Sequence, residues 1–476
     1  MSSYNKSWVY VLPFDADARL CGADRRAGAL VREGLIEHGV RLAAVDDVDA
    51  RHALFDGLHA AVDLRDHAAG DRTLVLERLD ILDVQIADDV ADLDVVAQAL
   101  DIGEDHELFS AQRGSELARG GIAVNGLGHC HPAIVKCLEE RAHTILHCSN
   151  YFYNEPAVQT AKLIVENSCF DKVLFANSGA EANEGQIKLA RKYAKDHGHP
   201  ERFVVITMKN SFHGRTLATC TATGQYAVHR YFEPLPSGFR YAEFNNLQSV
   251  KDIMDEYVCA ILTEPVQGEG GVRPASQEFL QGLRDLCDEK GILLMFDEVQ
   301  VGSGRTGKLF AHQNYGVEPD TCSMAKALGS GVPIGAVCAR GDAAKTLTPG
   351  THGSTFAGGP LACALAATTL DVMINEGVIE NARVMGEYFR DQMHKVIEKN
   401  HPKAVNEIRG LGMINGIQLN HPSGQPVVDL CFQDNKVLIN NTNGNVLRFV
   451  PPLITGKEEI DLCIKAVDEA MTKLGW

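Results

Sequence analysis

The feature that most constrains the fold is an alternation, after residue 120, of short apolar runs with helical stretches. The runs have the length and composition of buried strands: KVLFA (172–176), FVVITM (203–208), VCAILT (258–263) and ILLMF (292–296). Stretches typical of helices lie between them, such as EANEGQIKLARKYAKDHG (181–198) and QEFLQGLRDLCDEKG (277–291). Strands alternating with helices predict an α/β fold with a mostly parallel sheet, whose ligands gather at the carboxyl ends of the strands.

The composition changes abruptly near residue 112. Residues 1–110 carry 23 acidic and 10 basic side chains, a net charge of −13 out of −18 for the whole chain. We therefore expect an acidic N-terminal segment over 1–112, a large domain over 113–375 and a smaller C-terminal domain over 376–476. The acidic segment is either an appended regulatory or partner-binding domain or an artefactual extension.

The acidic segment contains the run LDILDVQIADDVADLDVV (79–96), in which aspartates alternate roughly with apolar residues. This pattern fits a strand with one acidic face or a solvated segment that does not pack. A calcium-binding loop is disfavoured, because the DxDxDG spacing and the terminal glutamate are absent.

Composition excludes several classes of function. The charge of −18 argues against a nucleic-acid surface, which needs clustered lysine and arginine. No apolar window is long enough to span a membrane, and the start MSSYNKSWVY lacks the pattern of a secretory signal. The 13 cysteines include no CxxC pair, so we expect free thiols in a reducing cytoplasm.

Two short motifs suggest cofactors that their context disfavours. Gly302, Gly307 and Lys308 have most of the spacing of a phosphate-binding loop, but leucine and phenylalanine follow the lysine where Ser or Thr would hold magnesium. The run His129-Cys130-His131 offers metal ligands, but adjacent residues point in different directions and no distant pair completes a site. We therefore predict neither a nucleotide nor a metal.

The proline that follows this run, Pro132, is typical of the first residue of a helix. We expect that helix to be PAIVKCLEERAHTIL (132–146).

Asp297 and Lys326 are the residues best suited to chemistry. Asp297 directly follows the strand 292–296, where it serves either as a helix cap or as the partner of a cationic ring nitrogen. Lys326 lies among small and apolar neighbours in CSMAKALGSG (322–331). Such a lysine is usually a surface residue with an extended side chain. If its amine is desolvated, it becomes a nucleophile for a carbonyl group.

Three further segments supply complementary groups. The turn Ser178-Gly179-Ala180 opens a helix after a strand, and such a helix start binds phosphate. SFHGR (211–215) brings an aromatic ring and a guanidinium, and HGSTFAGGP (352–360) brings two hydroxyls. An amine, a carboxylate, a ring to stack on and a site for a dianion are together what pyridoxal 5′-phosphate (PLP) requires.

These motifs identify a family. From about residue 120 to 476 the chain resembles the class III aminotransferases of PLP fold type I, whereas residues 1 to about 115 do not match. The resemblance implies a large domain with a mostly parallel central sheet flanked by helices, and a smaller α+β C-terminal domain. It is carried by GIAVNGLGHCHP (121–132), HCSNYFYNEP (147–156), NSGAEANE (177–184), SFHGRT (211–216), EPVQGEGG (264–271), DEVQVGSGRTG (297–307), MAKALGSGVPIGA (324–336), HGSTF (352–356) and NVLRFVPPL (445–453).

The resemblance also assigns residues to the cofactor. Lys326 would bind its aldehyde covalently and shuttle the substrate's proton, and Asp297 would keep its ring nitrogen protonated. Thr355 would come from the partner subunit of a homodimer. The remaining cofactor-binding residues implied are Ser178, Gly179 and Ala180 at the phosphate, Phe212 and Val299 on the ring faces, Gln300 near the phenolic oxygen, and His213 and Ser354.

Substrate recognition follows from the same resemblance. Arg215 would bind the α-carboxylate of an ω-amino donor, and Arg448 would bind the α-carboxylate of glutamate. Glu269 would cover Arg448 while the ω-amino donor is bound, and Glu264 belongs to the same substrate-binding set. A bidentate guanidinium suits each carboxylate, and a reserve acid masks the unused charge.

The activity implied is transfer of the δ-amino group of N2-acetylornithine to 2-oxoglutarate, a step of arginine biosynthesis. Ornithine, succinylornithine, succinyldiaminopimelate and 4-aminobutyrate are alternative donors. A catalytically impaired scaffold is the alternative from another class. It arises because the family's usual N-terminal segment is replaced by SAQRGSELARGG (110–121).

The loop HGSTFAGGP also departs from the family's usual STFGGNP at Ala357 and Gly359. Ala357 is tolerated only if its position does not require a positive φ.

Overall fold

The computed structural model describes residues 120–476. The acidic segment predicted over 1–112, including the run 79–96, lies outside the described residues. The domain boundaries predicted after residues 112 and 375 stay predictions.

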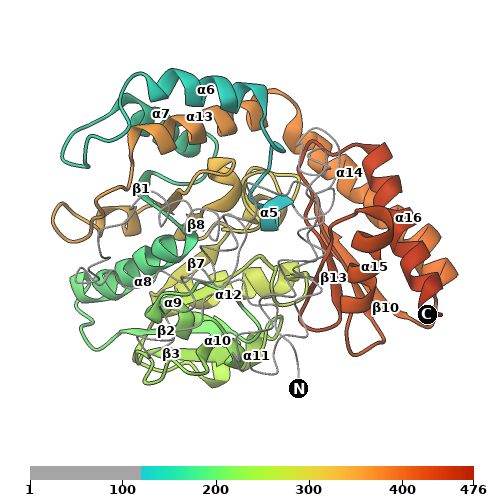
Figure 1. Ribbon diagram of the computed structural model, residues 1–476. Helices are drawn as coiled ribbons and strands as arrows, with labels where there is room; N and C mark the ends of the chain where they lie inside the picture. The colour runs from blue at the N-terminus through green and yellow to red at the C-terminus, as the bar shows by residue number, and fades with distance from the viewer. Residues whose placement is uncertain (1–119) are drawn as a thin grey trace, which may run out of the picture. The chain divides into compact units, whose positions relative to one another are not determined.

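The central feature of the structure is a seven-stranded mixed sheet (Figure 1). Four of its six strand pairings are parallel, and the two antiparallel pairings both involve β9, so only β9 is reversed. This confirms the predicted mostly parallel sheet. In spatial order the strands are β1 (Lys172–Ala176), β9 (Gly335–Ala339), β8 (Thr321–Met324), β7 (Leu293–Asp297), β4 (Val258–Thr263), β2 (Val204–Met208) and β3 (Phe239–Ala242).

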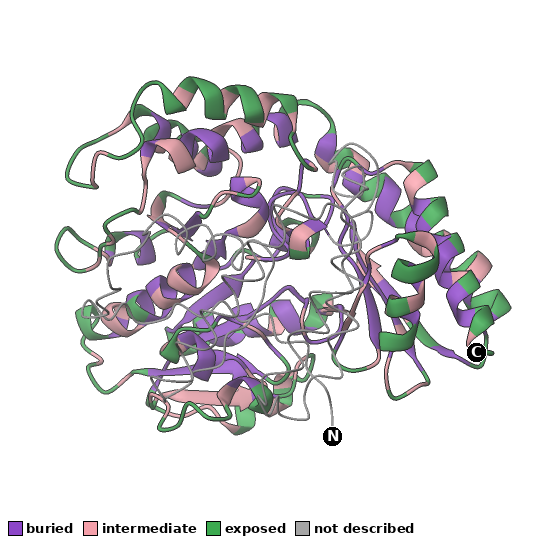
Figure 2. Ribbon diagram, viewed as in Figure 1, coloured by how far each residue is buried: buried purple, intermediate pink, exposed green. Residues whose placement is uncertain are grey.

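The inner strands of this sheet are apolar because helices cover both of its faces. Every residue of β2, β4 and β7 is buried, and these strands appear purple in Figure 2. Helix α8 (Gly179–Asp196) shares a hydrophobic cluster with one face. Helices α7 (Glu155–Glu166), α12 (Gln277–Lys290) and α13 (Pro360–Asn375) share a second cluster with the other. Coverage of both faces explains why these strands are near-continuous hydrophobic runs rather than alternating ones.

The other helices of this part of the chain are short or lie at its surface. The predicted helix that starts at Pro132 is α6, which ends at Ala142, four residues before the predicted end, and has no buried residue. The others are α5 (Gly120–Ala123), α9 (Leu217–Ala222), α10 (Tyr226–His229), α11 (Leu247–Asp252), η3 (Ala311–Asn314), η4 (Lys326–Gly329) and η5 (Ala343–Lys345).

The C-terminal part of the chain forms a smaller antiparallel sheet. Its order is β10 (Val405–Leu411), β11 (Ile414–Leu419), β13 (Val446–Phe449) and β12 (Asn440–Thr442). Four helices complete this region, and residues of all four share one hydrophobic cluster with the sheet: α14 (Val378–Gln392), η6 (Met393–Glu398), α15 (Gln425–Asn435) and α16 (Lys457–Lys473). A separate hairpin, β5 (Val266–Gln267) with β6 (Arg273–Pro274), carries Glu269 at its turn.

The topology brings the chemically suited residues to one edge. Strands β1, β2, β4, β7 and β8 run in the same direction, so their carboxyl ends share one edge of the large sheet. The segments that leave this edge begin with or contain the predicted site residues: Ser178 after β1, 211–215 after β2, Glu264 after β4, Asp297 at the end of β7 and Lys326 after β8.

Two further observations concern the described residues. Among residues 120–476 no single helix is long and apolar enough to cross a bilayer, and one bent pair, α13 with 378–398, passes by length and composition alone. All the cysteines in this range are free thiols, and most of them are buried.

Candidate active site

Asp297, the last residue of β7, is buried and held from both sides. Its Oδ2 accepts hydrogen bonds from Asn183 Nδ2 at 2.7 Å and from His213 Nδ1 at 2.8 Å. Its Oδ1 accepts one from the Val299 amide at 3.0 Å and a longer one from Ser323 Oγ at 3.4 Å. With only 4% of its surface exposed, this carboxylate is fixed in position by its donors.

Sequence reasoning missed Asn183 as part of this cluster. It lies on the buried side of α8, within the NSGAEANE motif, and also donates to the His213 carbonyl at 2.8 Å. The signal that could have found it is a polar residue on the helix face that otherwise packs against the sheet. His213 completes the cluster, and its Nε2 is buried without a hydrogen-bond partner among the described residues.

Lys326 follows β8, the strand that pairs with β7 in the sheet. Strand β8 pairs Ser323 with Asp297, and Lys326 follows three residues later. Its φ is +48°, in the left-handed region that a side chain rarely adopts, and such strain concentrates at functional sites. Burial lowers the pKa of the Lys326 amine, helped by Arg448 and opposed by Glu269, Asp297 and Glu264. The shift is toward the neutral amine, the form that nucleophilic chemistry requires.

Glu264 follows β4 and lies close enough to interact with both Asp297 and Lys326. Burial, followed by the nearby Asp297 charge, holds the pKa of Glu264 well above its usual range. Its two oxygens accept hydrogen bonds from the amides of Phe212 at 3.2 Å and Gly268 at 3.3 Å. The glutamate therefore ties the loop after β2 to the β5–β6 hairpin.

The N-terminus of α8 faces Val299. Ser178 caps the helix by accepting a hydrogen bond from the Glu181 amide at 3.2 Å, which leaves the amides of Gly179 and Ala180 without partners inside the helix. A Cβ on Gly179 would lie 2.6 Å from Val299 Cγ1, so only glycine permits this close approach. An anion is favoured at such a helix start by the amides and by the helix dipole.

The loop that contains Ser354 and Thr355 reaches the same helix end. Ser354 Oγ accepts a hydrogen bond from Asn177 Nδ2 at 2.9 Å, whereas Thr355 is exposed. Ala357 is not among the residues with positive φ, and Gly358 takes that conformation instead, with φ +71°. The departure from the family pattern at Ala357 is therefore compatible with the backbone.

Two arginines near the site have different surroundings. Arg215 is exposed, lies over the Phe212 ring at 5.4 Å and forms no ion pair within residues 120–476. Arg448, in β13, has only 1% of its surface exposed, and its Nη1 donates to Glu269 Oε1 at 2.5 Å. One guanidinium is open to solvent and the other is covered by a carboxylate.

The Arg448–Glu269 pair belongs to a small network. Gln300 Nε2 donates to Glu269 Oε1 at 3.1 Å, and its Oε1 accepts from Arg448 Nη1 at 3.2 Å. Asn440, which sequence reasoning missed, accepts from Arg448 Nε at 3.1 Å. Burial acts to raise the pKa of Glu269, but Arg448, Lys326 and Gln300 together lower it, so the carboxylate stays charged.

The two disfavoured motifs have other surroundings. The loop that contains Gly302 and Gly307 is followed by the four-residue η3 rather than by a long helix, and it packs Arg305 against the C-terminal part. Arg305 Nη1 donates to the carbonyls of Met413, at 3.1 Å, and of Pro451. Within the described residues no group of three His, Cys, Asp or Glu side chains has the arrangement of a metal site.

The assembled groups fit PLP. They provide a desolvated amine, a buried carboxylate fixed by four donors, the Phe212 ring, next in sequence to the histidine that contacts that carboxylate, and a helix N-terminus. In that order, these groups are suited to bind the aldehyde of PLP, to balance the charge of its protonated ring nitrogen, to stack on its ring and to bind its phosphate.

Comparison with known proteins identifies the family. The family model described as aminotransferase class III matches residues 116–471. Curated acetylornithine aminotransferases from Caldanaerobacter subterraneus subsp. tengcongensis and Methanocaldococcus jannaschii are each 47% identical to this chain, over 354 and 356 residues. The matches cover 74% of this chain and 89% and 88% of those proteins.

Solved structures agree with this assignment. The ornithine aminotransferase of Toxoplasma gondii superposes with a TM-score of 0.73 at 31% identity, over 80% of this chain and 96% of that one. The N-acetylornithine aminotransferase of Stenotrophomonas maltophilia gives a TM-score of 0.65 at 37% identity, over 75% and 90%. A structure of the Toxoplasma protein crystallised with oxidized glutathione has PLP at partial occupancy at the active site.

Proposed function

This chain belongs to the class III aminotransferases, which are PLP-dependent transaminases, and on that premise we propose that it moves the δ-amino group of N2-acetylornithine to 2-oxoglutarate. The products are an acetylated glutamate semialdehyde and glutamate, which places the reaction in arginine biosynthesis. Curated acetylornithine aminotransferases at 43–47% identity support this choice of donor.

The observation that carries the proposal is that the carboxylate of Glu269 covers the guanidinium of Arg448, which lies close enough to Lys326 to affect its pKa. A δ-amino donor holds its α-carboxylate far from the reacting amine, whereas glutamate holds it next to the reacting amine. An enzyme that uses both in turn needs an arginine that is masked for the first substrate and released for the second. The Glu269–Arg448 pair, at 2.5 Å, has the structure of such a mask.

The residues that would hold PLP come from the carboxyl edge of the large sheet. Lys326 would bind the aldehyde, Asp297 the ring nitrogen, and Phe212 and Val299 the ring faces. The phosphate would lie at Ser178, Gly179 and Ala180, with Ser354 and the partner's Thr355 nearby, and Gln300 would lie near the phenolic oxygen. When bound, PLP supplies an electron sink for the carbon that loses its proton.

The side chains around that sink hold and move charge. Lys326, with its lowered amine pKa, would carry the substrate's proton between two carbons, which requires an amine that is neutral when it accepts the proton. Asp297 would keep the ring cationic, since its four donors fix the charge in place. His213 would orient Asp297 through the 2.8 Å bond to Nδ1. Glu264 would hold the loop of Phe212 against the hairpin.

Arg215 would bind the α-carboxylate of the δ-amino donor. It is exposed, it has no acidic partner among the described residues, and its position over Phe212 keeps it next to the ring's proposed place. Arg448 would bind the α-carboxylate of glutamate after Glu269 moves away. Asn440 would keep the guanidinium oriented in both states through the 3.1 Å bond to Nε.

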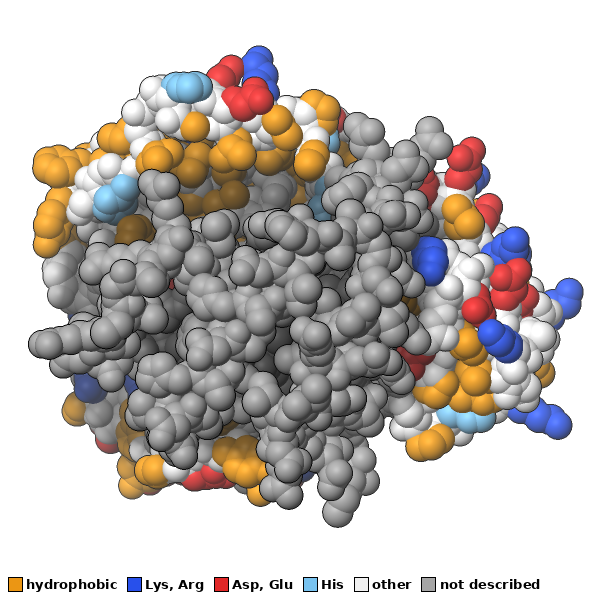
Figure 3. Space-filling model, in the orientation of Figure 1, with side chains coloured by type: hydrophobic (Ala, Val, Ile, Leu, Met, Phe, Trp, Pro, Cys, Tyr) orange, Lys and Arg blue, Asp and Glu red, His pale blue; other side chains and the backbone are white. Residues whose placement is uncertain are grey.

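We also propose a cytoplasmic homodimer. Large apolar side chains are exposed on α6 and on the loop that joins α6 to α7, and Figure 3 shows hydrophobic side chains gathered over this region. They include Leu138, Ile145, Leu146, Tyr151, Phe152 and Tyr153. An apolar patch of this kind supports a protein–protein interface. The free thiols support a reducing compartment.

A panel of donors tests the substrate. N2-acetylornithine, ornithine, succinylornithine, succinyldiaminopimelate and 4-aminobutyrate would be assayed in parallel with 2-oxoglutarate, using PLP-loaded protein. We expect the highest kcat/KM with N2-acetylornithine. A clear preference for unacetylated ornithine would overturn the donor, and no activity with any amine would favour the impaired scaffold. The Lys326→Ala variant gives the background rate.

A further inference from the structure

A second cluster of reactive side chains lies outside the proposed active site. Cys169, just before β1, has its Sγ 3.7 Å from His312 Nε2, and His312 Nδ1 is 2.8 Å from Glu298 Oε1. A thiol, an imidazole and a carboxylate thus follow one another in hydrogen-bond contact. This is the order of nucleophile, imidazole and orienting acid that activates cysteine in enzymes of several folds.

The inner two members of this cluster are held rigidly. Glu298 is buried and also accepts hydrogen bonds from the backbone amides of Ala311 and His312. The His312 ring packs edge-on or tilted against Phe170, Phe296 and Phe310, with centroids 5.4 to 6.4 Å apart. Burial lowers the pKa of His312, but Glu298 and Cys169 outweigh it and raise the pKa to about 9. The imidazole is therefore protonated at neutral pH and donates toward the sulfur.

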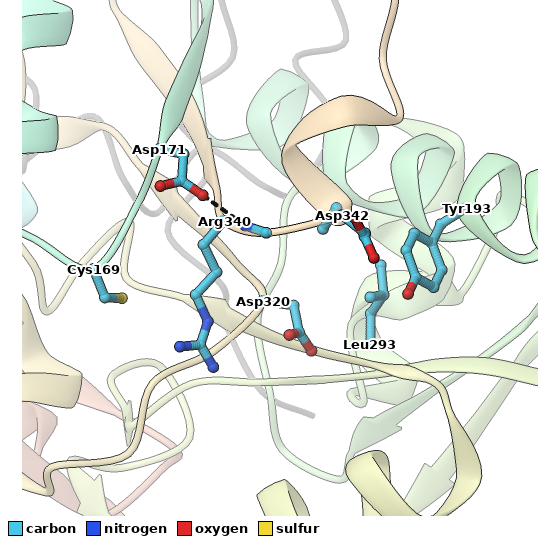
Figure 4. A pocket seen from close by; sticks show the side chains of 9 residues that line it. Cys169, Asp171, Tyr193, Leu293, Asp320, Arg340 and Asp342 are labelled. Atoms are coloured by element: carbon cyan, nitrogen blue, oxygen red, sulfur yellow. Dashed lines mark hydrogen bonds between the residues drawn. The ribbon is translucent and has the colours of Figure 1, made fainter.

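Cys169 is the member that ligands can reach. It is half-buried and lines a cavity of about 440 Å³, shown in Figure 4. The cavity lies at the amino ends of the parallel strands, since most of its other walls come from residues just before β1 and β8, from the first residue of β7 and from residues that follow β9. This is the edge of the sheet opposite the proposed active site. Its charged lining residues are Asp171, Asp320, Arg340 and Asp342.

The charges of this cavity favour a cationic ligand. Asp320 pairs with Arg284, Arg340 with Glu318, and Asp342 with Lys345. Asp171 accepts only the Gly341 amide, at 2.7 Å, and forms no ion pair within residues 120–476. Asp171, the lining carboxylate without an ion pair in this range, lines the same cavity as the thiol and follows it by two residues in sequence.

We propose that Cys169 is a nucleophilic thiol, activated by His312 and Glu298, that exchanges with small amine-bearing disulfides admitted through this cavity. The Cys169 sulfur attacks one sulfur of the disulfide, the S–S bond breaks, and the other half leaves as a thiolate. The thiol proton passes to solvent, and His312 keeps its own. The product is a mixed disulfide on Cys169, and the small disulfide is the oxidant.

Cys137 provides a control within the same molecule. It lies on α6, is also half-buried, and makes no side-chain hydrogen bond in the described range. Full-length, PLP-loaded protein would be treated with limiting cystamine, a dication, or with 3,3′-dithiodipropionate, a dianion of similar length. Peptide mass spectrometry would give the modification rate at each cysteine.

We expect cystamine to modify Cys169 about tenfold faster than Cys137, because the His312 imidazole lies within hydrogen-bond distance of the Cys169 sulfur and Cys137 makes no such contact in the described range. His312→Gln should remove that advantage and leave the Cys137 rate unchanged. Asp171→Asn keeps the acceptor for the Gly341 amide, so it should lower the preference of Cys169 for cystamine over dithiodipropionate without changing Cys137.

The rates in the wild-type protein decide the matter even if the His312 variant fails to fold. Equal cystamine rates at Cys169 and Cys137 would overturn the activation of the thiol. A Cys169 that reacts faster with the dianion would overturn the proposed ligand class. A folded His312→Gln protein with an unchanged Cys169 rate would overturn the role of the imidazole.

Discussion

The carboxyl edge of the large sheet and the β5–β6 hairpin hold their carboxylates in opposite ways. Asp297 ends an inner strand and is fixed by four donors from three separate segments and its own loop. Glu269 lies at a hairpin turn, and its carboxylate contacts only the side chains of Arg448 and Gln300 in the described residues. To move Asp297 would require repacking the core, whereas Glu269 can leave by a side-chain rotation.

This difference separates two tasks that the proposed reaction imposes. The groups that do the chemistry must stay in place for both substrates, so they belong on rigid strands. The group that distinguishes the substrates must change place between half-reactions, so it belongs on a short hairpin with few contacts. The following tests change the fixed groups, a buried pair that adjoins Asp297 in sequence, and the movable Glu269 in turn.

The largest effect is expected from Lys326→Ala. Without the amine, transamination should fall by about 10⁴-fold or more, because both the covalent anchor and the proton carrier are lost. The assay is turnover of N2-acetylornithine with 2-oxoglutarate. Lys308→Ala, which removes an exposed lysine from the loop after β7, is the matched control and should retain full activity. Comparable activity in the two variants would exclude Lys326 from the chemistry.

Asp297→Asn tests the fixed carboxylate next. The substitution preserves shape but removes the charge beside the ring nitrogen, and a drop in kcat of about 10² to 10³ is expected for losing such a stabilising group. Both half-reactions should slow equally, since both use the same ring. A selective effect on one half-reaction would instead place Asp297 with Glu269 among the groups that select substrates.

The Glu298–His312 pair, next to Asp297 in sequence, gives a test that depends on pH. The pKa of His312 in the folded protein is about 9, above the usual 6.5. The stabilisation that the pair gives the folded state is therefore complete below pH 6.5 and is lost as the pH rises through 9. The free energy of unfolding should fall by about 3 kcal/mol more in wild type than in His312→Gln between these values. Urea unfolding at pH 6 and pH 9.5 measures it, and parallel curves would contradict the buried ion pair.

Glu269→Gln should have the smallest and most selective effect. With the mask removed, Arg448 stays available to glutamate, and the preference for N2-acetylornithine over glutamate as donor should fall about tenfold, or about 1.4 kcal/mol. The ratio of the two kcat/KM values measures this. Glu243→Gln, which changes an exposed glutamate paired with Lys209, should leave the ratio unchanged. An equal loss with both donors would show that Glu269 does not select between them.

The sequence predicted the fold best where segments are locally distinctive. The apolar runs that became β1, β2, β4 and β7 were predicted to within one residue at each end. Strands β3, β8 and β9 were missed because they are short and lack a clear period. The C-terminal sheet was not predicted strand by strand, because its pairs join distant residues, such as Gln418 with Val446.

The site shows the same limit. Lys326 and Asp297 could be expected together, because parallel strands bring their carboxyl ends to one edge. Asn183 reaches Asp297 across 114 residues, and Cys169 reaches His312 across 143, so no local pattern announces either contact. Asn440 was missed for another reason, since an asparagine near a strand is typical of a turn.

The most direct measurement is a spectroscopic titration of the purified, PLP-loaded protein with N2-acetylornithine and then with 2-oxoglutarate. The account predicts that the visible absorbance of PLP joined covalently to Lys326 disappears when the donor is added and returns when the oxo acid is added. The same absorbance should be absent in Lys326→Ala. Retention of that absorbance at saturating N2-acetylornithine, or its presence unchanged in Lys326→Ala, would contradict the account.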